Sequence, residues 1–110
     1  MLLFTYGTLD HNHPTMVNAE MVCPVETVEK YYKGQQSFYP YLLEKCYDIA
    51  KVQQMKNIEG TLWEIPKSDF IAIDKYEGSP ELFYRTEIEV EMENLKYSAQ
   101  CYFINESEVW

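Results

Sequence analysis

With 110 residues, of which 46% are apolar, the chain has the composition of a folded protein and the length of one domain, which we place at residues 1–110. Its net charge of −9 argues against nucleic acids as partners, because their phosphates would be repelled, whereas cationic small molecules would be tolerated. No apolar run reaches the ~20 residues of a membrane-spanning helix, and the apolar start is too short for a signal peptide. We therefore expect a soluble, cytoplasmic protein without membrane contact.

The first half of the chain is predicted to be mainly extended. Residues 2–6 are typical of a central strand, which stops abruptly at the turn Tyr6-Gly7-Thr8-Leu9. Backbone N–H groups at such a tip can hold an anionic or carbonyl oxygen. A polar loop over residues 10–16 follows, and Pro14 is expected to open a short helix toward Val22.

Further strands are expected before residue 66. They are predicted at residues 25–33, ending at Gly34, at residues 42–47, and within an extended stretch over residues 53–65. Residues 38–41 are expected to interrupt regular structure. Gly60 marks a bulge or a point where two backbones approach closely.

The second half predicts one helix and one hairpin. The helix follows Ser68, the expected N-cap, carries an apolar stripe of Phe70 and Ile73 joined by Ile71 and Tyr76, and ends at Gly78-Ser79-Pro80. Residues 86–92 and 97–103 alternate between apolar and polar side chains around a turn at Glu93-Asn94. The outward face of the first of these strands is acidic: Glu87, Glu89 and Glu91. The elements together predict a mostly antiparallel α+β domain.

Glu77 is the carboxylate that we single out among eighteen acidic residues. It lies in the last turn of the predicted helix, where the negative end of the helix dipole and burial beside aromatic residues both disfavour its ionised form. A raised pKa would suit a general base or acid. From its position alone, an ordinary surface glutamate is the more common outcome.

Other reactive residues give no comparable pattern. His11 and His13 share a polar loop without a third ligand nearby, so we expect no metal site. Three cysteines at wide spacings, with no CxxC, predict reduced thiols rather than disulfides or zinc. No serine or cysteine lies in a nucleophile motif, so a covalent nucleophile is not expected.

Taken together, the motifs resemble those of the gamma-glutamylcyclotransferase-like superfamily. The similarity covers residues 2–104, and five segments occur in that family's order: Phe4-Thr5-Tyr6-Gly7-Thr8-Leu9, Phe38-Tyr39-Pro40-Tyr41-Leu42, Ile58-Glu59-Gly60-Thr61-Leu62-Trp63-Glu64-Ile65, Ile73-Asp74-Lys75-Tyr76-Glu77-Gly78 and Phe83-Tyr84-Arg85-Thr86. Each segment is common by itself, but the ordered set is specific.

The resemblance implies a small, mixed, mostly antiparallel β-barrel with flanking helices and a cavity at its mouth. It implies that a small-molecule γ-glutamyl substrate is held by Tyr6, Gly7, Thr8 and Leu9, with Glu77 as the catalytic base and no cofactor. Tyr84 would line the pocket, and Tyr39 would help to form its wall.

The short chain and the threonine after Tyr6-Gly7 look closest to the AIG2-like, gamma-glutamylamine cyclotransferase branch. Its reaction is attack of the glutamyl α-amine on the γ-amide carbonyl, which releases 5-oxoproline and an amine. Family members often carry a basic residue and a glycine after the turn, whereas Asp10-His11-Asn12-His13 stands here, so the leaving group can differ. Two alternatives stay open: a binding module that uses the same pocket for a small ligand or a protein partner, and a transferase or hydrolase that acts on a modified side chain or nucleotide.

Overall fold

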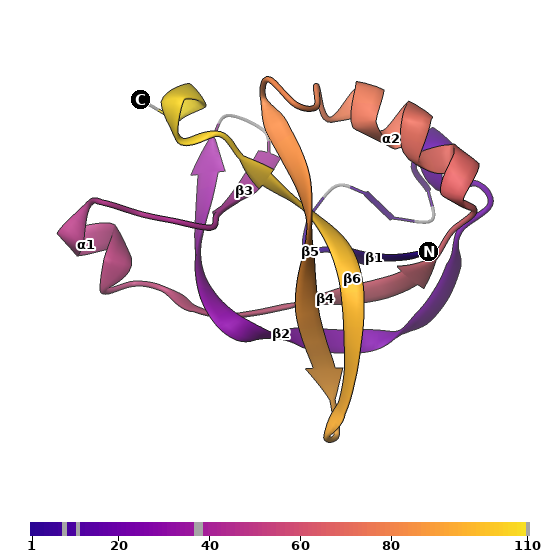
Figure 1. Cartoon of the computed structure of the whole chain (residues 1–110), viewed down its shortest axis with the longest axis horizontal. Helices are drawn as coiled ribbons and strands as arrows, with labels where there is room; N and C mark the ends of the chain where they lie inside the picture. Colours follow the sequence, from indigo (N-terminus) through magenta and orange to yellow (C-terminus); the bar gives the residue numbers. More distant parts are fainter. Residues whose placement is uncertain (8, 11, 37–38, 110) are drawn as a thin grey trace.

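The computed structural model describes residues 1–7, 9–10, 12–36 and 39–109. Its strands form one sheet in the order β3-β2-β4-β1-β6-β5, and a further pairing between β2 and β5 closes five of them into a barrel, with β3 as an added strand (Figure 1). The strands are β1 (Leu2–Thr5), β2 (Glu20–Gln36), β3 (Tyr39–Leu43), β4 (Lys56–Glu64), β5 (Phe83–Met92) and β6 (Leu95–Ile104). Since β1 is parallel to β6 and the other pairs are antiparallel, the predicted mixed, mostly antiparallel α+β barrel is confirmed.

Helices are short and lie between the strands. The α-helices are α1 (Ile49–Val52) and α2 (Phe70–Tyr76), and the 3-10 helices are η1 (Pro14–Met16), η2 (Lys67–Asp69) and η3 (Glu106–Glu108). No helix in the described ranges is long and apolar enough to cross a membrane.

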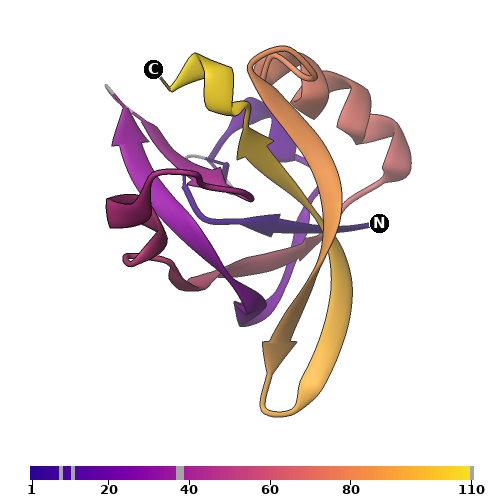
Figure 2. The same cartoon turned by 60° about the vertical axis from the view of Figure 1, so that its left-hand side comes forward.

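A bulge in β2 allows this long strand to curve around the barrel (Figure 2). The register against β4 shifts between Glu26 and Lys30. There the fully buried Thr27 hydroxyl donates to the Glu29 carbonyl at 2.7 Å and accepts from the Ile58 N–H at 2.9 Å. The Asn57 amide donates to two carbonyls of the bulge, at 2.9 and 3.0 Å. These side chains satisfy backbone groups that the interrupted ladder leaves unpaired.

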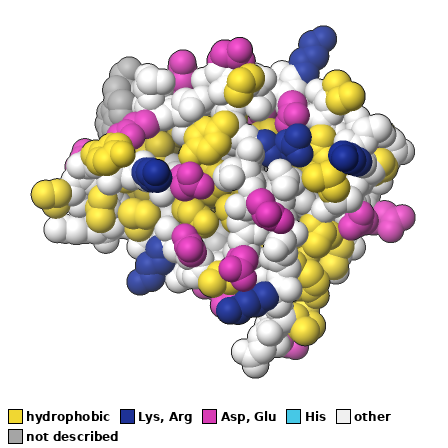
Figure 3. Space-filling model, viewed as in Figure 1, with side chains coloured by type: hydrophobic (Ala, Val, Ile, Leu, Met, Phe, Trp, Pro, Cys, Tyr) yellow, Lys and Arg dark blue, Asp and Glu magenta, His cyan; other side chains and the backbone are white. Residues whose placement is uncertain are grey.

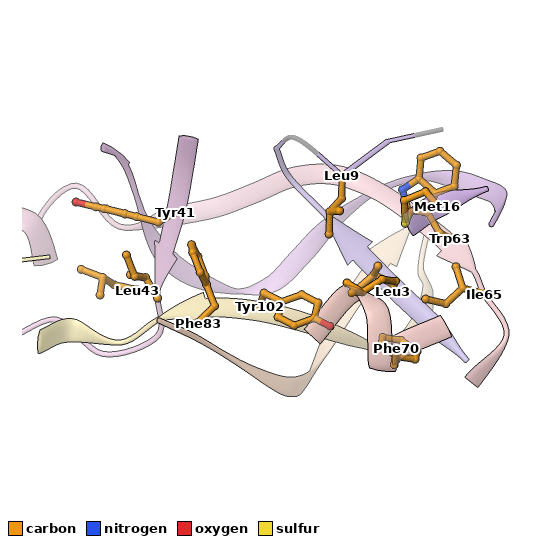
Figure 4. Close-up of a cluster of buried hydrophobic side chains, with 12 residues drawn as sticks. Leu3, Leu9, Met16, Tyr41, Leu43, Trp63, Ile65, Phe70, Phe83 and Tyr102 are labelled. Carbon is orange, nitrogen blue, oxygen red and sulfur yellow. The ribbon is translucent and has the colours of Figure 1, made fainter. Parts of the chain in front are cut away.

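Two clusters of buried side chains form the core. One is made of strand residues only, including Phe4, Leu62 and Phe103, and fills the barrel. The other packs η1 and α2 on the outside of the sheet, where Met16 and Phe70 lie near residues of β1 and β4 (Figure 4). Because neighbouring strand residues point to opposite faces, Leu3 and Phe4 belong to different clusters.

Gly60 is a point of close approach, as predicted. It lies in β4 opposite the end of β1, and a methyl group there would overlap the Thr5 carbonyl oxygen and the Phe4 ring. On the same strand pair, the Trp63 indole N–H donates to the Thr5 hydroxyl at 2.8 Å. The end of β1 is thereby held firmly against β4.

Several predicted boundaries in the first half are wrong. The strand expected to end at Gly34 continues to Gln36, because Gly34 lies opposite Tyr41 and leaves room for its ring. The strand expected at residues 42–47 is β3, so Tyr39 to Tyr41 pair with β2 instead of interrupting regular structure, while Phe38 lies outside the described residues. The helix expected from Pro14 is the single turn η1, and the extended stretch from residue 53 begins only at Lys56.

In the second half the helix start differs and the hairpin is confirmed. Ser68 lies inside η2, and α2 begins at Phe70 with Asp69 as the N-cap residue, whose side chain makes no capping hydrogen bond to the helix. Phe70 and Ile73 are buried, but Ile71 is exposed. The hairpin of β5 and β6 turns at Glu93 and Asn94, both with positive φ, and its tip projects from the barrel (Figures 1 and 2).

Replacing Thr27 by valine should destabilise the fold. The change keeps the side-chain shape but leaves the Ile58 N–H and the Glu29 carbonyl without their buried partner, which should lower the free energy of unfolding by about 2 kcal/mol or more. Urea unfolding measures this effect. Thr86→Val, at a half-buried site on β5, is the matched control, and an equally small change in both variants would contradict the role of Thr27.

Candidate functional site

A cavity of about 230 Å³ lies at the end of β1, where four parts of the chain meet. It brings together the turn after β1, the start of β3, the end of α2 with the segment leading into β5, and one residue of β6. The described lining residues are Phe4, Thr5, Tyr6, Gly7, Leu9, Tyr39, Pro40, Tyr76, Glu77, Leu82, Phe83 and Tyr102. The two parts that the sequence singled out, the turn and Glu77, therefore share one cavity.

The turn after β1 forms one wall and is packed on both sides. The Tyr6 hydroxyl donates to the Tyr102 carbonyl at 2.6 Å. A methyl group at Gly7 would lie 2.6 Å from Cγ of Pro40, so glycine allows the turn to touch β3. Leu9 is buried in the outer core cluster, and Thr8 lies outside the described residues. Burial, with a smaller contribution from the nearby Cys101 and Glu77 side chains, raises the pKa of Tyr6 well above its ordinary value.

Glu77 is held in place by the way in which α2 ends. It is the C-cap residue, and its own N–H donates to the Ile73 carbonyl at 2.9 Å. Gly78 follows with a φ of 66°, and the N–H groups of Gly78 and Ser79 donate back to the carbonyls of Lys75 and Asp74. This is the Schellman arrangement, in which glycine takes the left-handed conformation at low cost. The backbone of Glu77 is therefore fixed independently of the cavity.

The Glu77 carboxyl lies in an environment that disfavours its charge. Burial, one of the two predicted causes, raises its pKa to about 7. Among the described residues that line the cavity there is no lysine, arginine or histidine to pair with it. A carboxyl that is about half ionised near neutral pH can both accept and donate a proton.

A polar network lies behind the cavity. Asp74, one helical turn before Glu77, pairs with Arg85, with Oδ1 3.0 Å from Nε and Oδ2 3.3 Å from Nη2. The Tyr102 hydroxyl donates to Asp74 at 2.5 Å, and the Arg85 guanidinium lies over the Phe70 ring. Because Tyr102 also accepts the Tyr6 hydrogen bond through its carbonyl, this network connects α2 to the turn.

Tyr39 and Tyr84 were both expected at the pocket, but they lie in different places. Tyr39 lines the cavity, and its ring meets that of Phe83 edge-on with centroids 6.0 Å apart. Tyr84 is not among the described lining residues, contrary to expectation. Its ring stacks on Phe103 and its hydroxyl donates to the Glu44 carboxylate at 3.3 Å. Since side chains alternate along a strand, the preceding residue, Phe83, faces the cavity instead.

Sequence reasoning missed seven of the described lining residues: Phe4, Thr5, Pro40, Tyr76, Leu82, Phe83 and Tyr102. Tyr76 and Phe83 lay within matched motifs, directly beside the residues that we named. Tyr102 follows Cys101 on the face of β6 opposite to the predicted apolar face, and alternation alone would have left it on the surface. It is buried because α2 covers that face.

His13 belongs to no metal cluster in the described ranges. No group of three or more His, Cys, Asp or Glu side chains there is placed to hold an ion, and His11 lies outside those ranges. The His13 ring instead caps η1 by accepting the Thr15 N–H. Cys23 and Cys101 are buried free thiols, and Cys46 is a half-buried one.

Comparisons with known proteins agree on one family. The model of the family described as "Gamma-glutamyl cyclotransferase, AIG2-like" matches residues 3–109. No curated protein sequence matches the chain.

Three of the similar solved structures share the fold. An AIG2-like protein from Mus musculus is 18% identical, with 99% of this chain and 82% of that chain covered and a TM-score of 0.76. A protein named gamma-glutamyl cyclotransferase is 16% identical, with coverages of 94% and 66% and a TM-score of 0.69. The protein c4763 from uropathogenic E. coli is 15% identical, with coverages of 98% and 81% and a TM-score of 0.67.

The carboxyl of Glu77 should titrate near pH 7 and make stability depend on pH. Because its pKa rises from 4.5 to about 7 on folding, the folded protein binds the proton more tightly, and stability falls as pH increases through that range. The free energy of unfolding of Glu77→Gln, relative to that of the wild type, should therefore increase by about 2 to 3 kcal/mol between pH 4.5 and 8.

Urea unfolding at several pH values measures the difference in free energy of unfolding, and carboxyl ¹³C NMR measures the pKa of Glu77. Glu87→Gln, on the exposed face of β5, is the control and should show no such change. A Glu77 resonance that titrates near 4.5 would contradict the prediction.

Proposed function

The chain belongs to the AIG2-like gamma-glutamyl cyclotransferase family, and from this we propose that it converts a γ-glutamyl amine into 5-oxoproline and a free amine. The observation that carries the proposal is the half-buried Glu77 carboxyl, with a pKa of about 7, in the same cavity as the turn after β1. One proton carrier and one set of backbone donors suffice for this reaction.

The reaction is an intramolecular acyl transfer. The Glu77 carboxylate takes a proton from the substrate's α-ammonium, and the freed amine attacks the γ-carbonyl carbon. The γ-carbonyl oxygen becomes an oxyanion as the new C–N bond closes the five-membered ring. Glu77 returns the proton to the amide nitrogen of the leaving group, and the old C–N bond breaks. The ring nitrogen then loses its second proton, which Glu77 passes to the departing amine. The amine leaves as an ammonium, so the four protons of the reacting nitrogens are conserved.

Much of the rate acceleration in this scheme comes from the tethering of the nucleophile to the carbonyl group. Because nucleophile and carbonyl belong to one molecule, ring closure has the high effective molarity of an intramolecular reaction. The N–H groups of the turn at Tyr6, Gly7 and Leu9 are assigned to the substrate carboxylate or to the oxyanion. Packing of Gly7 against Pro40 supports this role, since donors that are held rigidly need no reorganisation as charge develops.

The composition of the cavity favours a leaving group without a carboxylate near the amide. In a γ-glutamyl α-amino acid, that carboxylate would lie close to Glu77 among described walls that offer no cation. A γ-glutamyl-ε-lysine or a γ-glutamylated polyamine avoids this repulsion. Acidic side chains are spread over the face that Figure 3 shows, which also suits a cationic amine.

The direct test is to incubate the protein with γ-glutamyl-ε-lysine, γ-glutamylalanine and glutathione. We expect release of 5-oxoproline, measured by mass spectrometry, mainly from the first compound. Its kcat/KM should rise with pH and level off above about pH 7, because Glu77 must be ionised to accept the proton. Absence of product from all three would exclude the proposed function as stated.

Variants of two glutamates identify the base. Glu77→Gln should abolish turnover with little loss of Tm, whereas Glu81→Gln, an exposed residue four positions away, should leave turnover unchanged. Turnover that survives in Glu77→Gln would mean that another group carries the proton. Binding of γ-glutamyl-ε-lysine by the wild type without turnover would favour the binding-module alternative.

A further inference from the structure

The loop between β1 and β2 runs along α2 and is fastened at both ends. At the start of α2, the Asn18 amide donates to the Asp69 carboxylate at 3.3 Å. At its end, the His13 ring contacts the Tyr76 ring edge-on, with centroids 4.2 Å apart and an interplanar angle of 67°. Between these contacts, Met16 is fully buried in the outer core cluster. The position of His13 is therefore set by the core and not by solvent.

The orientation of the His13 ring is fixed locally. Its Nδ1 accepts the Thr15 N–H at 3.2 Å and lies 2.7 Å from the Thr15 hydroxyl oxygen. Accepting a hydrogen bond at Nδ1 leaves the proton of the neutral ring on Nε2. With Nδ1 engaged in the cap of η1, the ring is held against Tyr76.

Tyr76 is the residue through which this loop reaches the cavity. It lines the cavity directly before Glu77, yet 50% of its surface is exposed. In the described part of the chain, His13 provides the ring contact of Tyr76. Glu77, by contrast, is held by the backbone hydrogen bonds that end α2. Tyr76, in the wall of the cavity, and Glu77, the proposed base, are thus held by separate contacts.

We propose that His13 is a positioning residue for specificity: by holding Tyr76, it shapes the wall against which the leaving amine packs. This inference rests on the proposed function and deepens it, because the glutamyl part is assigned to the turn and only the amine would meet Tyr76. The substrates that depend on the contact are γ-glutamyl amines whose amine carries a long alkyl chain. A γ-glutamyl methylamide is too small to use this wall.

The test compares these two substrates in His13→Ala. We expect KM for γ-glutamyl-ε-lysine to rise about threefold to tenfold, the equivalent of one aromatic contact. KM for γ-glutamyl methylamide and both kcat values should change less than twofold, since Glu77 keeps its support. Val17→Ala, at an exposed residue of the same loop, is the matched control and should leave KM unchanged for both substrates.

A double-mutant cycle separates positioning from a general loss of structure. In the Tyr76→Ala background, His13→Ala should have no further effect on KM for γ-glutamyl-ε-lysine. His13→Phe, which keeps a ring but loses the Nδ1 acceptor, should retain part of the selectivity. An equal rise in KM for both substrates, or an undiminished effect of His13→Ala without Tyr76, would overturn the inference.

Binding measurements distinguish this inference from the proposed function. Calorimetric titration of Glu77→Gln, with and without His13→Ala, should show the same selective loss of affinity for γ-glutamyl-ε-lysine. If the wild type binds both compounds but turns over neither, a selective loss supports the inference while the proposed function fails. If turnover occurs and the ratio of affinities is unchanged, the inference fails alone. Binding of neither compound overturns both.

Discussion

Closure of the barrel through the bulge of β2 is the constraint on which the rest of the structure depends. Glu26 pairs with Glu59 of β4 and with Glu91 of the edge strand β5, so β2 closes the sheet into a barrel. The bulge beside it is possible only because Thr27 and Asn57 satisfy its backbone groups inside the protein. Closure brings the end of β1 beside β6 and the segment after α2, and the cavity lies at their meeting point.

Burial of a carboxyl at this point costs free energy, which the packing of the rest of the helix must offset. Phe70 and Ile73 bury one side of α2 in the outer core cluster, and Gly78 ends the helix so that Glu77 lines the cavity. The nearby cation is used elsewhere, since Arg85 engages both carboxylate oxygens of Asp74. The two acids thus have separate environments: Asp74 is paired with Arg85, whereas no cation lies beside Glu77 among the described lining residues, which supports the role proposed for Glu77.

Much of the fold follows from local patterns, and the errors lie where tertiary contacts override them. Alternation predicted the hairpin of β5 and β6, since each strand there has one face in the core. Gly34 looked like the end of a strand, but it is needed inside the strand to make room for the Tyr41 ring. Ser68 had the character of a helix cap, yet the 3-10 turn η2 precedes α2 and includes it. Phe83 lines the cavity where Tyr84 was expected, because strand pairing, not residue type, decides which side faces the cavity.

The sequence by itself determined the turn after the first strand, the carboxylate next to a helix-ending glycine, and the family motifs that connect them, because each is written in neighbouring residues. Only the tertiary structure decided that Tyr39, Tyr76, Phe83 and Tyr102 surround these groups and that the His13 ring contacts Tyr76. It also decided that the pKa of Glu77 is about 7. The physical reason is that burial is a property of the assembled chain: the residues that exclude water from Glu77 come from four separate segments, and no local pattern reports how they meet.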